Sequence, residues 1–299
     1  MSIKLPILIS TAVILSFSAC EKLSWEDDAT NTSAESSTAE THNITLRISS
    51  LEQHSFPYIE STRSTPLISD LCKRITFAVY NTEDGTKEKV IHQTSDDADF
   101  GHAGFDLPAG THKVLAMAHS SEKPASVNSA SKITFDANKV TDTFYEYATI
   151  TVDDQPQEIN MTLKRAVAMF RLIIKDEIPE DVEKLKFYYT GGSSTFSAID
   201  RCGIVKSRQT VILNAATGND TYEVFTFPRS DSDKLNMTIT ALDADDNVIA
   251  QKEFSNVPIC VNKITEYTGN LFDDKNQTES SNIHISIDSK WGETIKQTF

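Results

Sequence analysis

The chain has 299 residues, of which 39% are hydrophobic and 24% are charged, and its formal net charge is -15 at pH 7. This length is enough for one large or two ordinary folded domains. The acidic balance argues against nucleic-acid binding, because contacts with phosphate require a basic face. It also disfavours adsorption to anionic lipid surfaces, so any membrane attachment has to come from a lipid on the chain itself.

Residues 1–19 are predicted to be a lipoprotein signal peptide. A single cation, Lys4, precedes an apolar run that is too short to span a bilayer. The stretch Phe17-Ser18-Ala19-Cys20 then resembles a bacterial lipobox, with Phe17 where leucine is usual. We therefore expect an acyl group such as palmitate on Cys20, and several chains there would hold the protein stably in a membrane. An ordinary signal peptide with an incidental cysteine is the alternative.

Residues 20–42 form an acidic segment rich in serine and threonine, which includes the sequence "DDATNTSAESSTAET" over residues 27–41. It has almost nothing to bury and is predicted to be a flexible tether. Its acids Glu26-Asp27-Asp28 resemble the export signals that take lipoproteins to the cell surface in Bacteroidetes. A plain solvated linker is the alternative for these acids.

Residues 43–176 show apolar alternation with a period of two, which predicts half-buried antiparallel strands closed by turn residues. The first strand is expected over residues 43–49, with Ile44, Leu46 and Ile48 on one face. The later strands are expected in "RITFAVYN", "KVIHQ", "GFDLPAGTHKVLAMAH", "FYEYATITVDD" and "QEINMTLKRAVAMFRLIIKD". Turns are expected at Glu83-Asp84-Gly85 and Pro108-Ala109-Gly110.

Residues 177–299 repeat the pattern after a break near "KDEIPEDVE". Strands are expected in "KLKFYYTGG", "QTVILN", "YEVFTFP", "KLNMTITALDADDNVIAQKEFS", "CVNKITEYTGNLF" and "NIHISIDSKW". Short helical turns are expected only in "IPEDVEKL" and "ASVNSASKI". The prediction is an all-β chain with two tandem β-sandwich domains, each of about seven mostly antiparallel strands.

Three cysteines remain after Cys20, namely Cys72, Cys202 and Cys260. Three thiols cannot all pair within one chain. Cys202 and Cys260 both fall in the second half and are the candidate disulfide. Buried free thiols are the open alternative.

The motifs of common catalytic sites are absent from the sequence, so no catalytic residue, cofactor or metal site is predicted. His102, His112 and His119 lie close in sequence but fall at different strand positions, which favours surface histidines over a metal site. Asp243, Asp245 and Asn247 have the spacing of a calcium loop, yet the loop lacks its glycine and its closing glutamate. A hairpin tip is therefore expected there.

Three segments, taken with the lipobox, resemble the fimbrillin superfamily of Bacteroidetes type V pili. They are "LPAGTHKVLAMA", "MTLKRAVAMFRLII" and "NKITEYTGNLF" followed by a final strand that closes on Trp291. The resemblance implies two transthyretin-like β-sandwiches and a lipoprotein that is anchored in the outer membrane by its lipid and exposed at the cell surface. It also implies partners among other fimbrial subunits, bound by β-strand complementation, and is strongest for the anchor and accessory subunits.

In the stalk subunits of that family, a protease cuts after an arginine behind the first strand, and a strand from another subunit fills the groove that this opens. The corresponding loop here holds one arginine, Arg63, which is the candidate maturation site. An uncut chain would keep its first strand and its lipid. We therefore expect a structural, non-enzymatic pilus subunit, anchored in the outer membrane, that attaches or terminates the fibre. A protease-matured stalk or tip subunit and a surface glycan-binding lipoprotein are the alternatives.

Overall fold

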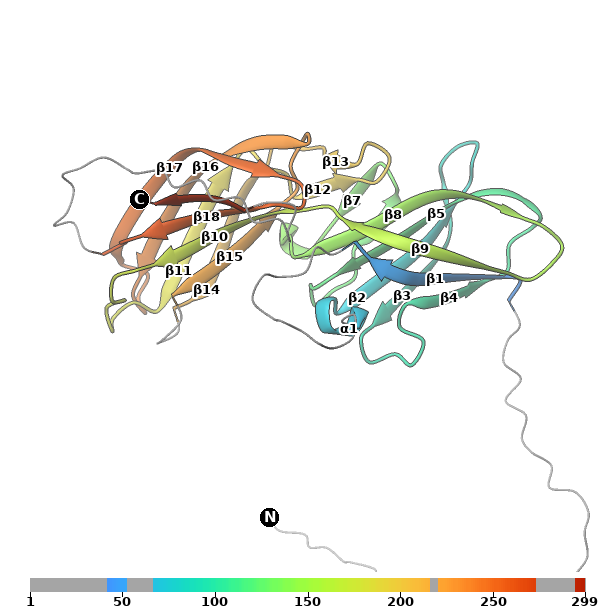
Figure 1. Ribbon diagram of the computed structural model, residues 1–299, viewed down its shortest axis with the longest axis horizontal. Helices are drawn as coiled ribbons and strands as arrows, with labels where there is room; N and C mark the ends of the chain where they lie inside the picture. The colour runs from blue at the N-terminus through green and yellow to red at the C-terminus, as the bar shows by residue number, and fades with distance from the viewer. Residues whose placement is uncertain (1–41, 53–66, 216–219, 273–293, 299) are drawn as a thin grey trace, which may run out of the picture. The chain divides into compact units, whose positions relative to one another are not determined.

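The computed structural model describes residues 42–52, 67–215, 220–272 and 294–298 (Figure 1). Up to residue 165 the strands are β1 (Ile44–Leu51), β2 (Arg74–Tyr80), β3 (Lys87–Thr94), β4 (His102–Phe105), β5 (Gly110–His119), β6 (Ser126–Ser129), β7 (Lys132–Thr134), β8 (Thr143–Val152) and β9 (Gln157–Arg165). The later strands are β10 (Ala168–Ile174), β11 (Lys184–Thr190), β12 (Thr195–Ser197), β13 (Cys202–Gly203), β14 (Arg208–Asn214), β15 (Thr221–Thr226), β16 (Ser232–Leu242), β17 (Val248–Cys260), β18 (Ile264–Gly269) and β19 (Thr294–Thr298). The described helices are α1 (Ile68–Leu71) and the 3-10 turn η1 (Asp136–Asn138). The all-β prediction is confirmed.

The first sheet has seven strands in the order β3-β2-β5-β8-β9-β1-β4. Strands β8 and β9 pair through Phe144↔Arg165 and Tyr145↔Lys164, and this short pairing joins two layers, β3-β2-β5-β8 and β9-β1-β4. Side chains of both layers meet in one core that includes Leu46, Phe77 and Val114. The apolar alternation in the sequence is therefore the inner face of a sandwich.

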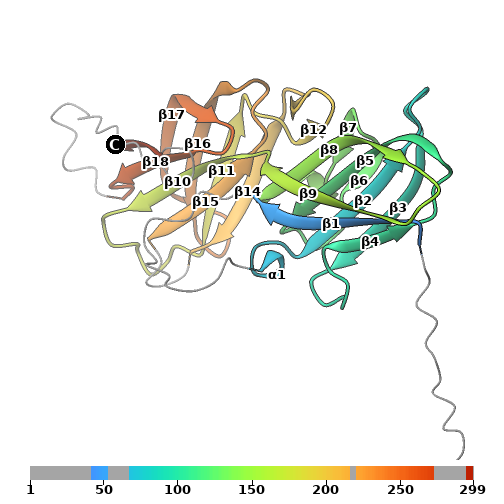
Figure 2. The ribbon, with the colours of Figure 1, turned by 45° about the vertical axis from the view of Figure 1, so that its right-hand side comes forward.

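The second sandwich is built from two four-stranded sheets, β15-β10-β18-β19 and β14-β11-β16-β17 (Figure 2). Its core includes Phe170, Phe187 and Tyr267, with ring centroids of Phe170 and Tyr267 5.3 Å apart. A fourth sheet of short strands, β13-β12-β7-β6, takes strands from both halves of the chain and covers a separate core that contains Tyr80, Phe196 and Phe227.

The two sandwiches share one topology. In the first, β1 pairs in parallel with β9 and antiparallel with β4. In the second, β10 pairs in parallel with β18 and antiparallel with β15. The layers β3-β2-β5-β8 and β14-β11-β16-β17 match in the same way, so β10 takes the place of β1. In addition, β19 is paired in parallel with β18.

Both predicted helical turns need correction. The segment "ASVNSASKI" forms the hairpin β6–β7, which pairs with β12 and so gains ladder hydrogen bonds that an isolated helical turn would lack. In "IPEDVEKL" the structure has a single turn, closed by the amide of Val182 on the carbonyl of Pro179 at 3.0 Å, and the segment then enters β11. Tertiary pairing outweighs the weak local preference in both cases.

The candidate disulfide is not formed, because Cys72, Cys202 and Cys260 are all free thiols. Cys202 pairs with Ser197 in the β13-β12-β7-β6 sheet, whereas Cys260 pairs with Ser232 in the β14-β11-β16-β17 sheet. Strand pairing thus holds the two cysteines in different sheets. Cys72 is buried, and the pKa of its thiol is raised mainly by desolvation, so it is an inert core residue.

The imidazole of His119 is fully buried at the end of β5. Its Nδ1 accepts hydrogen bonds from the amide and the hydroxyl of Ser121 at 3.3 and 2.5 Å, and its ring meets Phe135 edge-on with centroids 5.4 Å apart. Nε2 has no hydrogen-bond partner among the described residues. Burial, helped by the charges of Arg74 and His92, lowers the pKa of His119 from 6.5 to about 4.

We expect His119 to make the protein less stable as the pH falls from about 6.5 toward 4. In that window the unfolded chain binds a proton that the folded chain excludes, so the free energy of unfolding decreases, by about 2 kcal/mol from this residue at pH 5. Urea unfolding of the wild type and of His119→Gln at pH 7.5 and 5.0 measures the effect. The same loss of stability in both proteins on acidification would show that other groups are responsible.

Candidate functional site

Strand β1 lies inside its sheet, with a hydrogen-bonded neighbour on each edge. It pairs antiparallel with β4, from Ile44↔Phe105 to Arg47↔His102, and in parallel with β9, from Ile44↔Gln157 to Leu51↔Leu163. Figure 1 shows β1 in blue between these two strands. Removal of β1 would leave unpaired backbone groups on both neighbours.

The inner face of β1 is part of the first core. Ile44 and Leu46 are fully buried and Ile48 is 5% exposed, as the predicted alternation requires. At about 1.5–3 kcal/mol for each fully buried aliphatic side chain, the three contribute roughly 5–9 kcal/mol of burial free energy. This is comparable with the whole stability of a typical domain, so the sandwich depends on having a strand in this position.

Polar contacts fix the register of β1 at both ends. The side chain of Asn43 donates to the carbonyl of Leu107 at 2.6 Å and accepts from the amide of the same residue at 3.0 Å. At the other end, the Ser49 hydroxyl donates to the carbonyl of Met161 at 3.1 Å, and the Glu52 amide donates to the carbonyl of Leu163 at 2.7 Å. A register shift between Ile48 and Ser50 marks a bulge beside these contacts.

The predicted lipidation and maturation residues, Cys20 and Arg63, lie outside the described residues, as does Trp291. The chain is described up to Glu52 at the end of β1 and again from Leu67, just before α1. The predicted cleavage site thus falls between β1 and the rest of its sandwich in the chain order.

The histidines and the calcium-like segment considered in the sequence analysis have structural positions. The prediction of surface histidines is confirmed for His102, which is exposed on β4, but is wrong for His112 and His119. Both of these are buried because β5 lies inside its sheet, between β2 and β8. His112 lies beside Glu88, and its Nε2 is 2.9 Å from the carbonyl oxygen of Pro108. The calcium-like segment is the β16–β17 hairpin tip, where the Asp243 carboxylate accepts from the amides of Asp245 and Asn247 at 2.9 and 2.8 Å. These hydrogen bonds lower the pKa of Asp243. The predicted hairpin tip is confirmed.

Arg165 is a structural residue that the sequence reasoning missed. Its side chain is 2% exposed, binds both carboxylate oxygens of Asp142 at 2.8 and 3.0 Å, and donates to the side-chain oxygen of Asn262 at 3.1 Å. The guanidinium also lies 4.5 Å from the centroid of Phe144. Arg165 links the two sandwiches, because Asp142 precedes β8 and Asn262 lies in the turn between β17 and β18. The sequence pattern could have indicated this role: Arg165 follows Met161 and Leu163 at alternate positions of "MTLKRAVAM", which places it on the buried face of the strand.

Among the described residues, no group of three or more histidine, cysteine or acidic side chains could hold a metal ion. In the same residues no helix is long and apolar enough to cross a membrane. The candidate functional site is therefore strand β1, which contributes to the first core. In the sequence, β1 is followed by the segment that contains the predicted cleavage residue Arg63.

The fold defines a class of β proteins with two sandwiches, in which the first strand, β1, supplies part of the first core. The family model of fimbrillin-A associated anchor proteins Mfa1 and Mfa2 matches residues 37–296. The chain belongs to this family. It is therefore a fimbrial subunit of the cell surface and not an enzyme, as the sequence predicted.

Several solved structures are similar to the chain. The fimbrial anchor protein Mfa2 from Porphyromonas gingivalis is 10% identical, with 72% of this chain and 82% of that chain covered and a TM-score of 0.38. A fimbrial assembly protein from Parabacteroides distasonis is 14% identical over 79% and 91% of the two chains, with a TM-score of 0.39. A candidate adhesin from Bacteroides thetaiotaomicron is 15% identical over 71% and 80%, with a TM-score of 0.43. No curated protein matches the chain.

Proposed function

We propose that this chain is the outer-membrane-anchored base subunit of a type V pilus and that it works with its first strand in place. The observation that carries the proposal is the complete integration of β1, which has hydrogen-bonded neighbours on both edges and a fully buried Leu46. A sandwich with this position filled cannot accept a strand from another subunit there. Such a subunit ends the fibre and holds it to the cell.

The contact with the next subunit is proposed to be strand exchange, with β19 as the donor. Strand β19 lies at the edge of the β15-β10-β18-β19 sheet and pairs in parallel with β18. An edge strand has a ladder on one side, so its release breaks fewer hydrogen bonds than release of β1. Extended segments of this kind add to sheets through backbone hydrogen bonds.

The pairing of β10 also bears on the domain boundary. Because β10 takes the place of β1 in the second sandwich, we propose that this sandwich begins between Arg165 and Ala168, before the predicted break near residue 176.

Replacement of Cys20 by serine is expected to release the protein from the membrane fraction, because the acyl acceptor is lost and the acidic chain has little affinity for anionic lipid. Fractionation of the native host with immunoblotting measures this, and Cys72→Ser is the matched control because Cys72 is a core residue. Retention of the Cys20→Ser protein in the membrane would rule out lipid anchoring at this position.

Mass spectrometry of the native mature protein separates the anchor from the alternative of a protease-matured stalk or tip subunit. The proposal requires a single chain that begins at Cys20 and carries acyl groups. A mature N-terminus at Ser64 would show cleavage after Arg63 and removal of β1 together with the lipid.

A further inference from the structure

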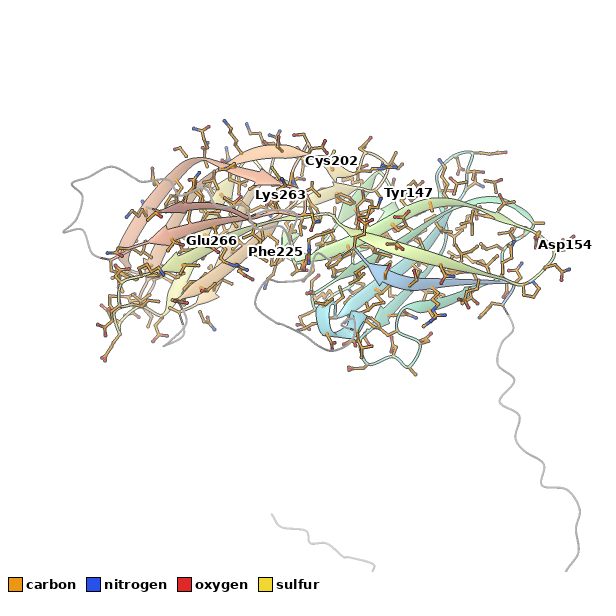
Figure 3. The ribbon with its side chains drawn as sticks, viewed as in Figure 1. Tyr147, Asp154, Cys202, Phe225, Lys263 and Glu266 are labelled. Carbon is orange, nitrogen blue, oxygen red and sulfur yellow. The ribbon has the colours of Figure 1, made fainter. Side chains whose placement is uncertain are left out.

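A cavity of about 130 Å³ opens where β8, β9 and the β12–β13 hairpin meet. Tyr145, Glu146 and Tyr147 of β8 form one wall, and Lys164 of β9 lies beside them. The hairpin contributes Ile199 and Arg201. In Figure 3, Tyr147 marks the β8 wall and Cys202 marks the hairpin that carries Arg201.

The aromatic wall is held rigidly from behind. The ring of Tyr145 meets Phe196 edge-on with centroids 4.6 Å apart, and the ring of Tyr147 meets Tyr80 in the same manner at 6.3 Å. Tyr80 is itself fixed by its hydroxyl, which donates to the carbonyl of Val127 at 2.8 Å. Rigid tyrosines offer a flat contact surface at a low cost in conformational entropy.

The polar groups around the cavity are not used by the fold. Among the described residues, no hydrogen bond or ion pair engages the side chains of Tyr145, Glu146, Tyr147 or Arg201. Burial raises the pKa of Glu146 above its ordinary value against the opposing charges of Lys164 and Arg201, and burial raises the pKa of Tyr145 to about 12. Partly desolvated polar groups without hydrogen-bond partners are typical of a surface that binds a ligand.

Arg201 adds a backbone feature to this set. Its φ of 62° is in the left-handed region, which residues other than glycine adopt at a cost in energy. The residue lies in the turn between β12 and β13, where a glycine would be the relaxed choice. Arg201 and Lys164 thus contribute two cations to the lining of the cavity, on a chain whose net charge is -15.

We propose that this cavity binds a carboxylated sugar residue of a glycan. A single pyranose ring suits its volume, which is well below the roughly 300–1,000 Å³ typical of pockets for larger ligands. Tyr147 packs against the ring and Arg201 binds the carboxylate. Exposed Ile199 covers an apolar edge of the ring.

Titration calorimetry of the full mature chain with three saccharides tests the proposal. The probes are 3'-sialyllactose and trigalacturonate, which carry a carboxylate from two different glycan sources, and lactose, which has none. We expect saturable binding of at least one acidic probe and at least tenfold weaker binding of lactose. Absence of binding by both acidic probes, or equal binding of lactose, would overturn the proposal.

Two variants at Arg201 and one control link binding to the cavity. Arg201→Gln is expected to weaken binding of the acidic probe at least tenfold, whereas Arg208→Gln, an exposed arginine on β14, is expected to change it less than twofold. Arg201→Gly should lose binding equally while its unfolding midpoint stays at or above that of the wild type, because glycine relaxes the left-handed backbone. Wild-type affinity in either Arg201 variant would overturn the assignment of the carboxylate contact.

Discussion

Leu46→Gln is expected to unfold the first sandwich or leave it barely stable. Leu46 is fully buried in the core behind β1. The change removes about 1.5–3 kcal/mol of burial free energy. It also places an amide without hydrogen-bond partners in the core, at a further cost of about 1–3 kcal/mol. The sum, roughly 3–6 kcal/mol, is a large part of the 5–15 kcal/mol that typically stabilises a domain. Urea unfolding and trypsin resistance of the full chain measure the loss.

Arg47→Gln is the matched control, because it introduces the same residue at the next position of the strand. Arg47 is on the exposed face, where its guanidinium lies 3.3 Å from Glu158 with both side chains about half exposed. Exposed ion pairs of this kind contribute about 0–1 kcal/mol. Equal destabilisation by the two changes would show that the face of β1 does not matter and that β1 is not a core strand. That result would also remove the basis for the filled-groove proposal.

Arg165→Met is expected to destabilise the chain by about 3–5 kcal/mol, since it leaves the largely buried carboxylate of Asp142 without its partner. The contact between Arg165 and Asn262 is lost as well, so the second sandwich also loses a link to the first. Calorimetric or urea unfolding of the full chain measures the change. The expected signature is a separation of one cooperative transition into two, because the sandwiches become less tightly coupled.

Lys164→Met is the control for this prediction, since Lys164 is the neighbour of Arg165 and its side chain is 59% exposed, 3.9 Å from Glu52. It is expected to change the stability by less than about 1 kcal/mol. The double variant Arg165→Met, Asp142→Leu is expected to recover part of the loss, because no unpaired charge stays buried. A loss for Arg165→Met no larger than that of Lys164→Met would mean that water satisfies Asp142 without the arginine.

The sequence alone determined the local structure of most strands. The alternation of Ile44, Leu46 and Ile48 predicted which face of β1 is buried, and all three side chains are in the core. Turn residues predicted the tight connections, including Gly85, whose φ is 71°. These features depend on residues close together in the chain, where period-two alternation and turn chemistry are decisive.

Only the tertiary structure decided which strands are neighbours. The run "QEINMTLKRAVAMFRLIIKD" looks continuous, yet it divides into β9, which pairs with β1, and β10, which pairs with β15 and β18. Likewise, the contact of Arg165 with Asn262 and the cavity beside Arg201 bring together residues from distant strands. Alternation records which side of a strand faces the core, but every strand of a sandwich carries the same alternation. The pairing partner is therefore set by long-range packing and connection geometry rather than by the local pattern.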